Sequence, residues 1–147
     1  MEPRDLVLAF VQQMTELATE LTNALSMTTG GNDLRSVVAA VRQKQLPREG
    51  GIPGGLRYRV HGAGCWIKTP DGVEIDADLG PGPFLLKFDA WRIRLYADSI
   101  GEEAVTDQEI SEALRDLADQ GLISRFPSSF PWYTFTAQKD DHQEALN

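Results

Sequence analysis

The N-terminal segment carries apolar side chains at three- and four-residue steps, the spacing of one face of an α-helix. This spacing predicts one long helix. We expect Asp5 to cap its start and Gly30-Gly31 to end it, because glycine adopts the left-handed conformation that leaves a helix. The apolar stripe consists of Leu6, Phe10, Met14, Leu17, Leu21 and Leu25.

A second helix is predicted from Asn32 or Asp33 to a point before Pro47, because the residue that precedes a proline avoids the helical conformation. Two helices joined by a short glycine turn predict an αα-hairpin over residues 1–46. Residues 47–55 then hold four glycines and two prolines, which predicts a connection without regular structure.

Alternation of apolar and polar residues replaces the helical spacing after this connection. It predicts strands over residues 56–61, 65–69 and 73–79. The Pro70-Asp71-Gly72 sequence between the last two is typical of a hairpin turn. These strands are therefore expected to form a small antiparallel sheet.

Helical signals return in the last third of the chain. Asp89 is expected to cap a helix that contains Trp91, and Thr106 with Glu109 forms a capping-box pattern before a second helix that ends at Gly121. A terminal β-hairpin is predicted from residues 122–126 and 132–135, around a turn at Pro127-Ser128-Ser129.

The predicted fold class is α+β, with an N-terminal helical hairpin, a small antiparallel sheet, two further helices and a C-terminal β-hairpin. At 147 residues the chain has the length of one domain. Within that domain, residues 56–138 are expected to form a mixed α/β core and residues 139–147 a polar tail.

The net charge of −8 is concentrated in the second part of the chain. Residues 1–60 hold seven Lys or Arg against six Asp or Glu, whereas residues 61–147 hold seven against sixteen. Such a surface repels phosphate backbones and attracts basic proteins, so no nucleic-acid partner is predicted. No apolar run approaches the roughly 20 residues that span a bilayer, and no secretory signal is evident, so a cytoplasmic location without membrane contact is expected.

The sequence His61-Gly62-Ala63-Gly64-Cys65 combines a thiol with a base. A nucleophilic thiolate needs such a neighbour. On an unbroken strand the Cα atoms of His61 and Cys65 would lie about 13 Å apart, so contact requires the glycines to turn the chain. The alternative is a tight turn in which Cys65 is a small buried apolar side chain.

Three carboxylates, Glu74, Asp76 and Asp78, share one face of the third predicted strand. They are typical of a solvated sheet face. Two further interpretations are a cation site completed by His61 and a surface that meets the basic residues of a partner.

Two later segments contain residue types found at interfaces. Trp91 and Arg92 are enriched at binding hot spots, although a buried tryptophan that anchors the helix to the sheet is the alternative interpretation. The helix that carries Glu109, Glu112 and Asp116, followed by a hairpin, is similar in outline to the recognition helix and wing of winged-helix proteins. Its acidic residues would be repelled from DNA, so DNA binding is not predicted.

The HGxGC pattern at 61–65, the acidic strand at 73–80 and the FDAWR pattern at 88–92 together resemble an uncharacterised family of small bacterial domains. The resemblance covers residues 56–135, leaves the helical hairpin outside, and implies no catalytic residue. In style the chain is also similar to the immunity proteins of bacterial toxin systems, which bind and neutralise a cognate toxin.

The function predicted from the sequence is an acidic protein-binding module, specifically an immunity protein whose partner is a basic toxin domain. No catalytic residue, metal or cofactor is predicted. The expected partner-binding residues are Glu74, Asp76, Asp78, Trp91, Glu109, Glu112 and Asp116.

Two alternatives remain at this point. A small hydrolase or metal-dependent enzyme would use His61, Cys65 and either Asp76 or Asp78, and it requires these side chains to converge in one pocket. A regulatory or structural subunit would associate with itself through the N-terminal amphipathic helices. The sequence does not fix the oligomeric state.

Overall fold

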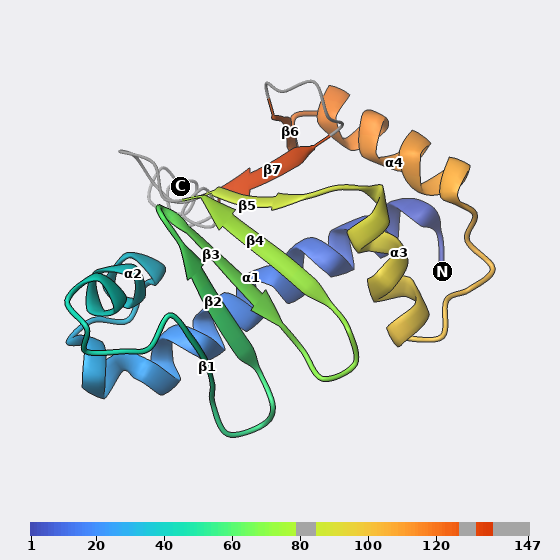
Figure 1. Ribbon diagram of the computed structural model, residues 1–147. Coiled ribbons are helices and arrows are strands. Elements are labelled where there is room, and N and C mark those ends of the chain that lie inside the picture. The colour runs from blue at the N-terminus through green and yellow to red at the C-terminus, as the bar shows by residue number, and fades with distance from the viewer. Residues whose placement is uncertain (79–84, 127–131, 137–147) are drawn as a thin grey trace, which may run out of the picture.

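The strands lie side by side in one layer, with the long helix α1 behind them (Figure 1). The computed structural model describes residues 1–78, 85–126 and 132–136. In these ranges the helices are α1 (Pro3–Thr29), α2 (Leu34–Arg42), α3 (Ala90–Ser99) and α4 (Asp107–Asp119). The strands are β1 (Glu49–Gly51), β2 (Arg57–His61), β3 (Gly64–Lys68), β4 (Glu74–Asp78), β5 (Leu85–Phe88), β6 (Ser124–Arg125) and β7 (Tyr133–Thr136).

These elements confirm the predicted α+β class, and the described strands form a single antiparallel sheet in the order β1-β2-β3-β4-β5-β7-β6. Because β7 pairs with β5, with Phe88 opposite Tyr133, the C-terminal hairpin extends the central sheet. The predicted turn at Pro127-Ser128-Ser129, the end of the third predicted strand at Leu79 and the predicted tail at 139–147 lie outside the described residues.

The glycine-rich stretch 47–55 is not wholly irregular, which corrects the sequence prediction. Residues Glu49–Gly51 form β1 at the edge of the sheet, with Gly50 opposite Tyr58 of β2. A Cβ atom at Gly50 would lie 2.9 Å from the ring of Tyr58. The glycine is therefore needed here because the tyrosine ring packs directly over the edge strand.

Helix α1 begins earlier than predicted, because Pro3 occupies the first helical position. Proline lacks the N–H group that would be left unpaired there, and its fixed φ angle suits the helix. Glu2 is the N-cap residue without a side-chain cap, and Asp5 lies inside the first turn. The predicted end is confirmed, since Gly30 adopts φ 74° and its N–H donates to the carbonyl of Ser26.

The other helix starts are confirmed by their hydrogen bonds. The carboxylate of Asp33 accepts from the backbone N–H of Ser36, and that of Asp89 accepts from the N–H of Arg92. Thr106 and Glu109 form a complete capping box at the start of α4. Each cap satisfies N–H groups that a helix leaves unpaired, so these short polar residues fix where three helices begin.

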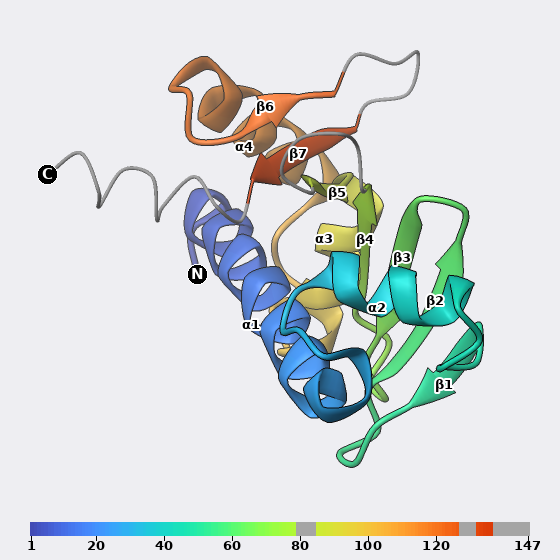
Figure 2. The ribbon, with the colours of Figure 1, turned by 90° about the vertical axis from the view of Figure 1, so that its left-hand side faces the viewer.

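Helix α1 packs against each of the other three helices, and α2 and α3 in turn contact the sheet (Figure 2). Its apolar stripe is buried from Leu6 to Leu21, and Phe10 meets Phe88 of β5 at a ring distance of 5.7 Å. The helical hairpin is thus part of the common core. The apolar face that a self-associating subunit would use is already occupied within the chain. None of the described helices has the length and apolar character needed to cross a bilayer.

The two faces of the sheet differ in character. One face packs on α1 and α2 and carries the buried residues Tyr58, Val60, Cys65, Ile67, Ile75, Ala77, Leu86 and Phe88. The opposite face is called the open face below. Its strand residues are Arg59, Trp66, Lys68, Glu74, Asp76, Asp78 and Lys87, and most of these are only partly buried.

Candidate functional site on the open face

A row of four side chains crosses the open face from β2 to β5. The strand register places Arg59 beside Trp66, Trp66 beside Asp76, and Asp76 beside Lys87. Neighbours in such a row are close enough for their side chains to interact. The row therefore alternates cation, aromatic ring, carboxylate and cation across the width of the central sheet.

All three tryptophans of the chain have a cation over the indole ring. The guanidinium carbon of Arg59 lies 5.4 Å from the ring centre of Trp66. That of Arg92 lies 4.6 Å from Trp132 and 5.4 Å from Trp91. Cations at these distances are attracted to the negative face of the ring, so each tryptophan is held by a charged neighbour.

Arg92 connects the first turn of α3 to the sheet. Its Nε donates to Oδ2 of Asp76 at 2.7 Å, and its NH1 group lies 3.3 Å from Oδ1 of Asp89. Asp89 is also the N-cap residue of α3, so one carboxylate fixes both the backbone start and the side chain of Arg92. The Arg92 side chain is only 14% exposed. We call Asp76, Asp89 and Arg92, with the rings of Trp91 and Trp132, the Arg92 cluster.

The three strand carboxylates do lie on one face, as predicted, but each is paired with a cation of the same chain. Lys68 Nζ lies 3.7 Å from Glu74, and Lys87 Nζ lies 3.1 Å from Asp78. The third carboxylate, Asp76, is held by Arg92. The stripe is therefore charge-compensated, so the fold does not present an uncompensated acidic face at this position.

Burial raises the pKa of Asp76 above the ordinary value, and the charge and hydrogen bond of Arg92 oppose that shift only in part. Removal of Arg92 would therefore leave a partly buried carboxylate without its main source of stabilisation. The contact between Asp76 and Arg92 is the electrostatic centre of the Arg92 cluster.

Trp91 does not anchor the helix to the sheet, which corrects one sequence interpretation. Its side chain is 54% exposed, and the buried residues of α3 are Ile93 and Ala97. Ile93 and Ala97 are spaced four residues apart and face the core, whereas the side chain of Trp91, in the first turn, does not face the core. An exposed tryptophan next to an ordered arginine is available to a partner.

The structure does not bring His61 and Cys65 together. Gly62 and Ala63 form the turn between β2 and β3, so Cys65 pairs with Val60 while His61 pairs with Gly64. Cys65 consequently faces the core and is 2% exposed, whereas His61 is exposed on the other side. Burial raises the pKa of the Cys65 thiol to about 12, which disfavours the nucleophilic thiolate.

Cys65 is expected to resist a thiol reagent such as Ellman's reagent in the folded protein at pH 8. A pKa of about 12 in place of 9 lowers the thiolate fraction about a thousandfold. Burial slows the reaction further. Labelling should therefore be at least about a thousandfold slower in the native protein than in urea. Rapid native labelling would show an accessible, activated thiol and would restore the case for nucleophilic chemistry.

The acidic residues of α4 form a second, separate surface. Glu109, Glu112 and Asp116 line a groove of about 310 Å³ with Glu2 and Arg4 of the N-terminal region. This groove lies between α1 and α4, in the helical layer, whereas the strand carboxylates lie on the open face. The seven residues predicted to bind a partner therefore belong to two surfaces.

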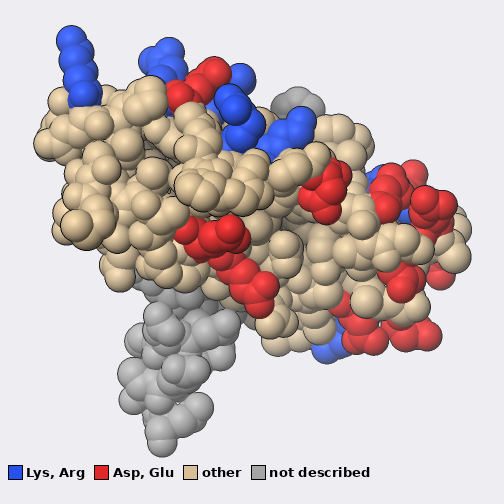
Figure 3. All heavy atoms as spheres, turned by 90° about the horizontal axis from the view of Figure 1, so that it is seen from below, with Lys and Arg blue, Asp and Glu red and all other residues tan. Residues whose placement is uncertain are grey.

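The negative charge is densest around this second surface. Residues 98–119 hold eight Asp or Glu and a single basic residue, Arg115. Figure 3 shows acidic side chains crowded at the end of the molecule that holds α3 and α4, with basic side chains along another edge. We call residues 98–119 the acidic end. Arg94 pairs with Asp98 and Asp107, but no described cation forms an ion pair with Glu112 or Asp116.

Sequence reasoning missed two of the tryptophans. Trp66 lies between the buried residues Cys65 and Ile67, so strand alternation places it on the same face as Lys68 and could have found it. No local signal indicates Trp132, because its contacts with Arg92 and Lys87 depend on the pairing of β7 with β5. Within the described ranges, no group of three His, Cys, Asp or Glu residues is arranged to hold a metal ion.

Comparison with known protein families gives a match over most of the chain. A family model described as a domain of unknown function, DUF6896, matches residues 4–134. The match includes both N-terminal helices, which the resemblance seen in the sequence had left outside. No curated protein and no solved structure matches the chain at a significant level.

Proposed function

The chain belongs to the DUF6896 family, and we propose that it is a protein-binding module that holds its partner on the open face. The observation that carries this proposal is the exposed Trp91 beside Arg92, whose side chain is fixed by two carboxylates. Tryptophan and arginine are the residue types that contribute most to protein–protein binding energy.

Order in the free protein supports this role for the Arg92 cluster. A flexible arginine loses side-chain entropy when a partner immobilises it, which weakens binding. Arg92 is already held by Asp76, Asp89 and the ring of Trp132 before any partner arrives. The open face therefore presents aromatic surface in a fixed arrangement, at a lower entropic cost than a mobile surface would require.

The proposed partner is a basic protein, and more specifically a toxin domain that this chain neutralises as an immunity protein. The excess of carboxylates at the acidic end supports a basic partner, because clustered like charge accelerates the approach of a protein of opposite charge. Because the charges of the open face are paired, they contribute little to the long-range electrostatic field. In this proposal the acidic end steers the partner and the open face binds it.

This division of roles predicts that neutralising the acidic end slows association without changing dissociation. The variant Glu112→Gln/Asp116→Asn removes two unpaired charges and leaves the capping box of α4 intact. Its association rate with the product of the gene immediately upstream should fall several-fold at low salt and depend less on salt. Stopped-flow measurements over a range of sodium chloride concentrations give both quantities.

The matched control is Glu16→Gln/Glu20→Gln, which makes the same change in net charge on α1. We expect this control to have a smaller effect on the association rate. Equal effects of the two double variants would mean that only net charge matters, which contradicts steering by the acidic end. An increased dissociation rate in Glu112→Gln/Asp116→Asn would instead place these residues in the bound interface.

A further inference from the structure

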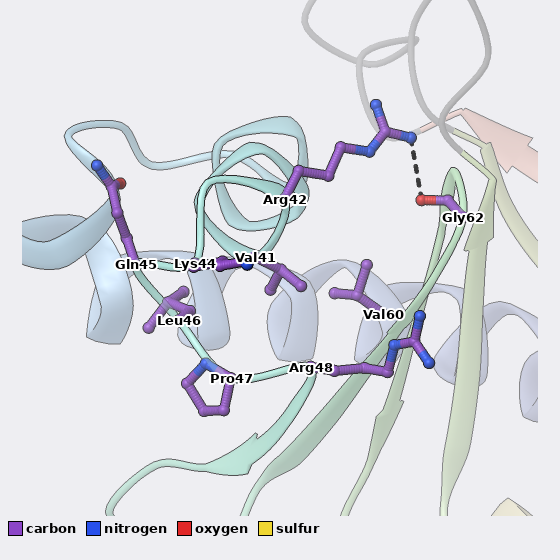
Figure 4. A pocket seen from close by; sticks show the side chains of 9 residues that line it. All are labelled: Val41, Arg42, Lys44, Gln45, Leu46, Pro47, Arg48, Val60 and Gly62. Carbon is purple, nitrogen blue, oxygen red and sulfur yellow. Dashed lines mark hydrogen bonds between the residues drawn. The ribbon is translucent and has the colours of Figure 1, made fainter.

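A concave site lies at the opposite part of the fold from the acidic end, between the end of α2 and strand β2 (Figure 4). Its volume is about 590 Å³. This is within the range of roughly 300–1,000 Å³ that is typical of small-molecule sites. Helix α2 contributes Val41 and Arg42, the following connection contributes residues 44–48, and the sheet contributes Val60 and Gly62.

Every charged residue that lines this site is a cation. Arg42, Lys44 and Arg48 line it, and no Asp or Glu does. Within the described part of the chain none of the three forms an ion pair with a carboxylate, although the protein as a whole carries a net charge of −8. Cations that line one hollow without a counter-charge repel one another, and an anion bound there would relieve that repulsion.

Arg42 is positioned by a bond across the mouth of the site. Its guanidinium donates to the carbonyl oxygen of Gly62 at 3.1 Å, which ties the last turn of α2 to the β2–β3 turn. Figure 4 shows Arg42 and Arg48 on either side of Val60, both extending towards β2, while Gln45 points away. Two guanidinium groups therefore flank the same apolar wall.

Lys44 has an unfavourable backbone conformation at this same place. Its φ angle is 62°, in the left-handed region, and it is the one described residue other than glycine with a positive φ. Helices often end on such a residue, but glycine is the usual choice because it has no Cβ. Non-glycine residues in strained conformations cluster at functional sites. Lys44 occupies a position where glycine would be less strained, and it adds a charge to the site.

Apolar side chains form part of the lining of the site. Val41, Leu46, Pro47 and Val60 line it together with the three cations. A second cavity of about 330 Å³ adjoins Arg42 and is also lined by Arg35 and Gln43. An inorganic ion alone would leave the apolar surface in water. The combination of several cations with an apolar wall matches an anion attached to a carbon skeleton.

We propose that this site binds a small phosphorylated organic molecule. Guanidinium groups recognise phosphate oxygens with paired N–H groups, and a lysine adds a point charge. The site is separate from the open face, so this inference is independent of the proposed protein-binding function. We call it the phosphate pocket, lined by Val41, Arg42, Lys44, Gln45, Leu46, Pro47, Arg48, Val60 and Gly62.

The test is a titration of the full-length ¹⁵N-labelled protein with 3-phosphoglycerate as the probe, at physiological salt, followed by NMR. We expect saturable shifts in the amide signals of Lys44, Arg48, Val60 and Gly62. Glycerate and inorganic phosphate should each bind at least about tenfold more weakly than 3-phosphoglycerate, since glycerate lacks the phosphate group and inorganic phosphate lacks the carbon skeleton.

The main variant is Arg48→Gln, because no described hydrogen bond or ion pair involves its side chain and the fold should be unchanged. Affinity for 3-phosphoglycerate should fall about tenfold in this variant, as expected for loss of one charged contact. The matched control is Arg115→Gln on α4, which should bind as the original protein does. Absence of saturable shifts would overturn the proposal. Shifts that are equal for phosphate and 3-phosphoglycerate, or equal in Arg48→Gln, would also overturn it.

Discussion

Replacement of Arg92 by glutamine is expected to lower the free energy of unfolding by about 2–3 kcal/mol at neutral pH. Loss of one partner of a fully buried ion pair costs about 3–5 kcal/mol, and exposed pairs contribute 0–1 kcal/mol. The side chains of Arg92 and Asp76 are 14% and 26% exposed, which places this pair between those limits. Urea denaturation of the purified variant gives the value directly.

The pH dependence of this loss identifies its cause. Because burial already raises the pKa of Asp76, removal of Arg92 should raise it further. A raised carboxyl pKa means that the folded state holds its proton over a range where the unfolded state has lost it. Stability therefore falls as pH rises through that range. The destabilisation by Arg92→Gln should be largest at neutral pH and should shrink as the pH falls and Asp76 becomes protonated.

Two further variants serve as controls. Asp76→Asn/Arg92→Gln should be less destabilised than the sum of the two single variants, because it removes the uncompensated charge along with its partner. Arg115→Gln, an exposed arginine on α4, should change stability by no more than about 0.5 kcal/mol. A loss in Arg92→Gln that is independent of pH would mean that its packing on Trp132, and not its charge, stabilises the fold.

Replacement of Trp91 by alanine is expected to weaken binding of the protein partner at least about 30-fold, which corresponds to the roughly 2 kcal/mol typical of a hot-spot residue. The fold should be affected much less, because the side chain is 54% exposed and lies outside the core. Isothermal titration calorimetry with the upstream gene product and urea denaturation of the variant measure the two effects separately.

Met27→Ala is the matched control for this prediction. Met27 is a large apolar residue that is 96% exposed, and it lies on α1, on the other side of the sheet from the open face. Its removal should leave affinity unchanged. If Met27→Ala weakens binding as much as Trp91→Ala does, the partner occupies the helical layer and the assignment of the open face is wrong.

Local chemistry predicted much of the fold. The caps at Asp33, Asp89 and Thr106 each depend on a side chain and a backbone group within three residues, so the sequence alone located them. The start of α1 was placed too late because Pro3 can occupy the first helical position without any cap. The strand β1 was missed because it exists only through its pairing with β2, which no local pattern records.

The site was predictable only in part, for a related reason. Alternation along β4 correctly placed Glu74, Asp76 and Asp78 on one face. It could not reveal that Arg92 and Lys87 neutralise two of these carboxylates, because one cation comes from a helix and the other from a neighbouring strand. A charge pattern in a sequence gives the positions of charges on an element, whereas their partners depend on tertiary packing.

Coexpression with the product of the gene immediately upstream tests the proposed immunity function and the role of the open face together. We expect this product to inhibit growth when expressed alone, the present protein to restore growth, and the two to elute as a one-to-one complex. We also expect Trp66→Ala/Trp91→Ala to abolish both the rescue and the complex. A harmless upstream product, or one that remains toxic without forming a complex, would contradict the immunity function. Full rescue by Trp66→Ala/Trp91→Ala would contradict binding through the open face.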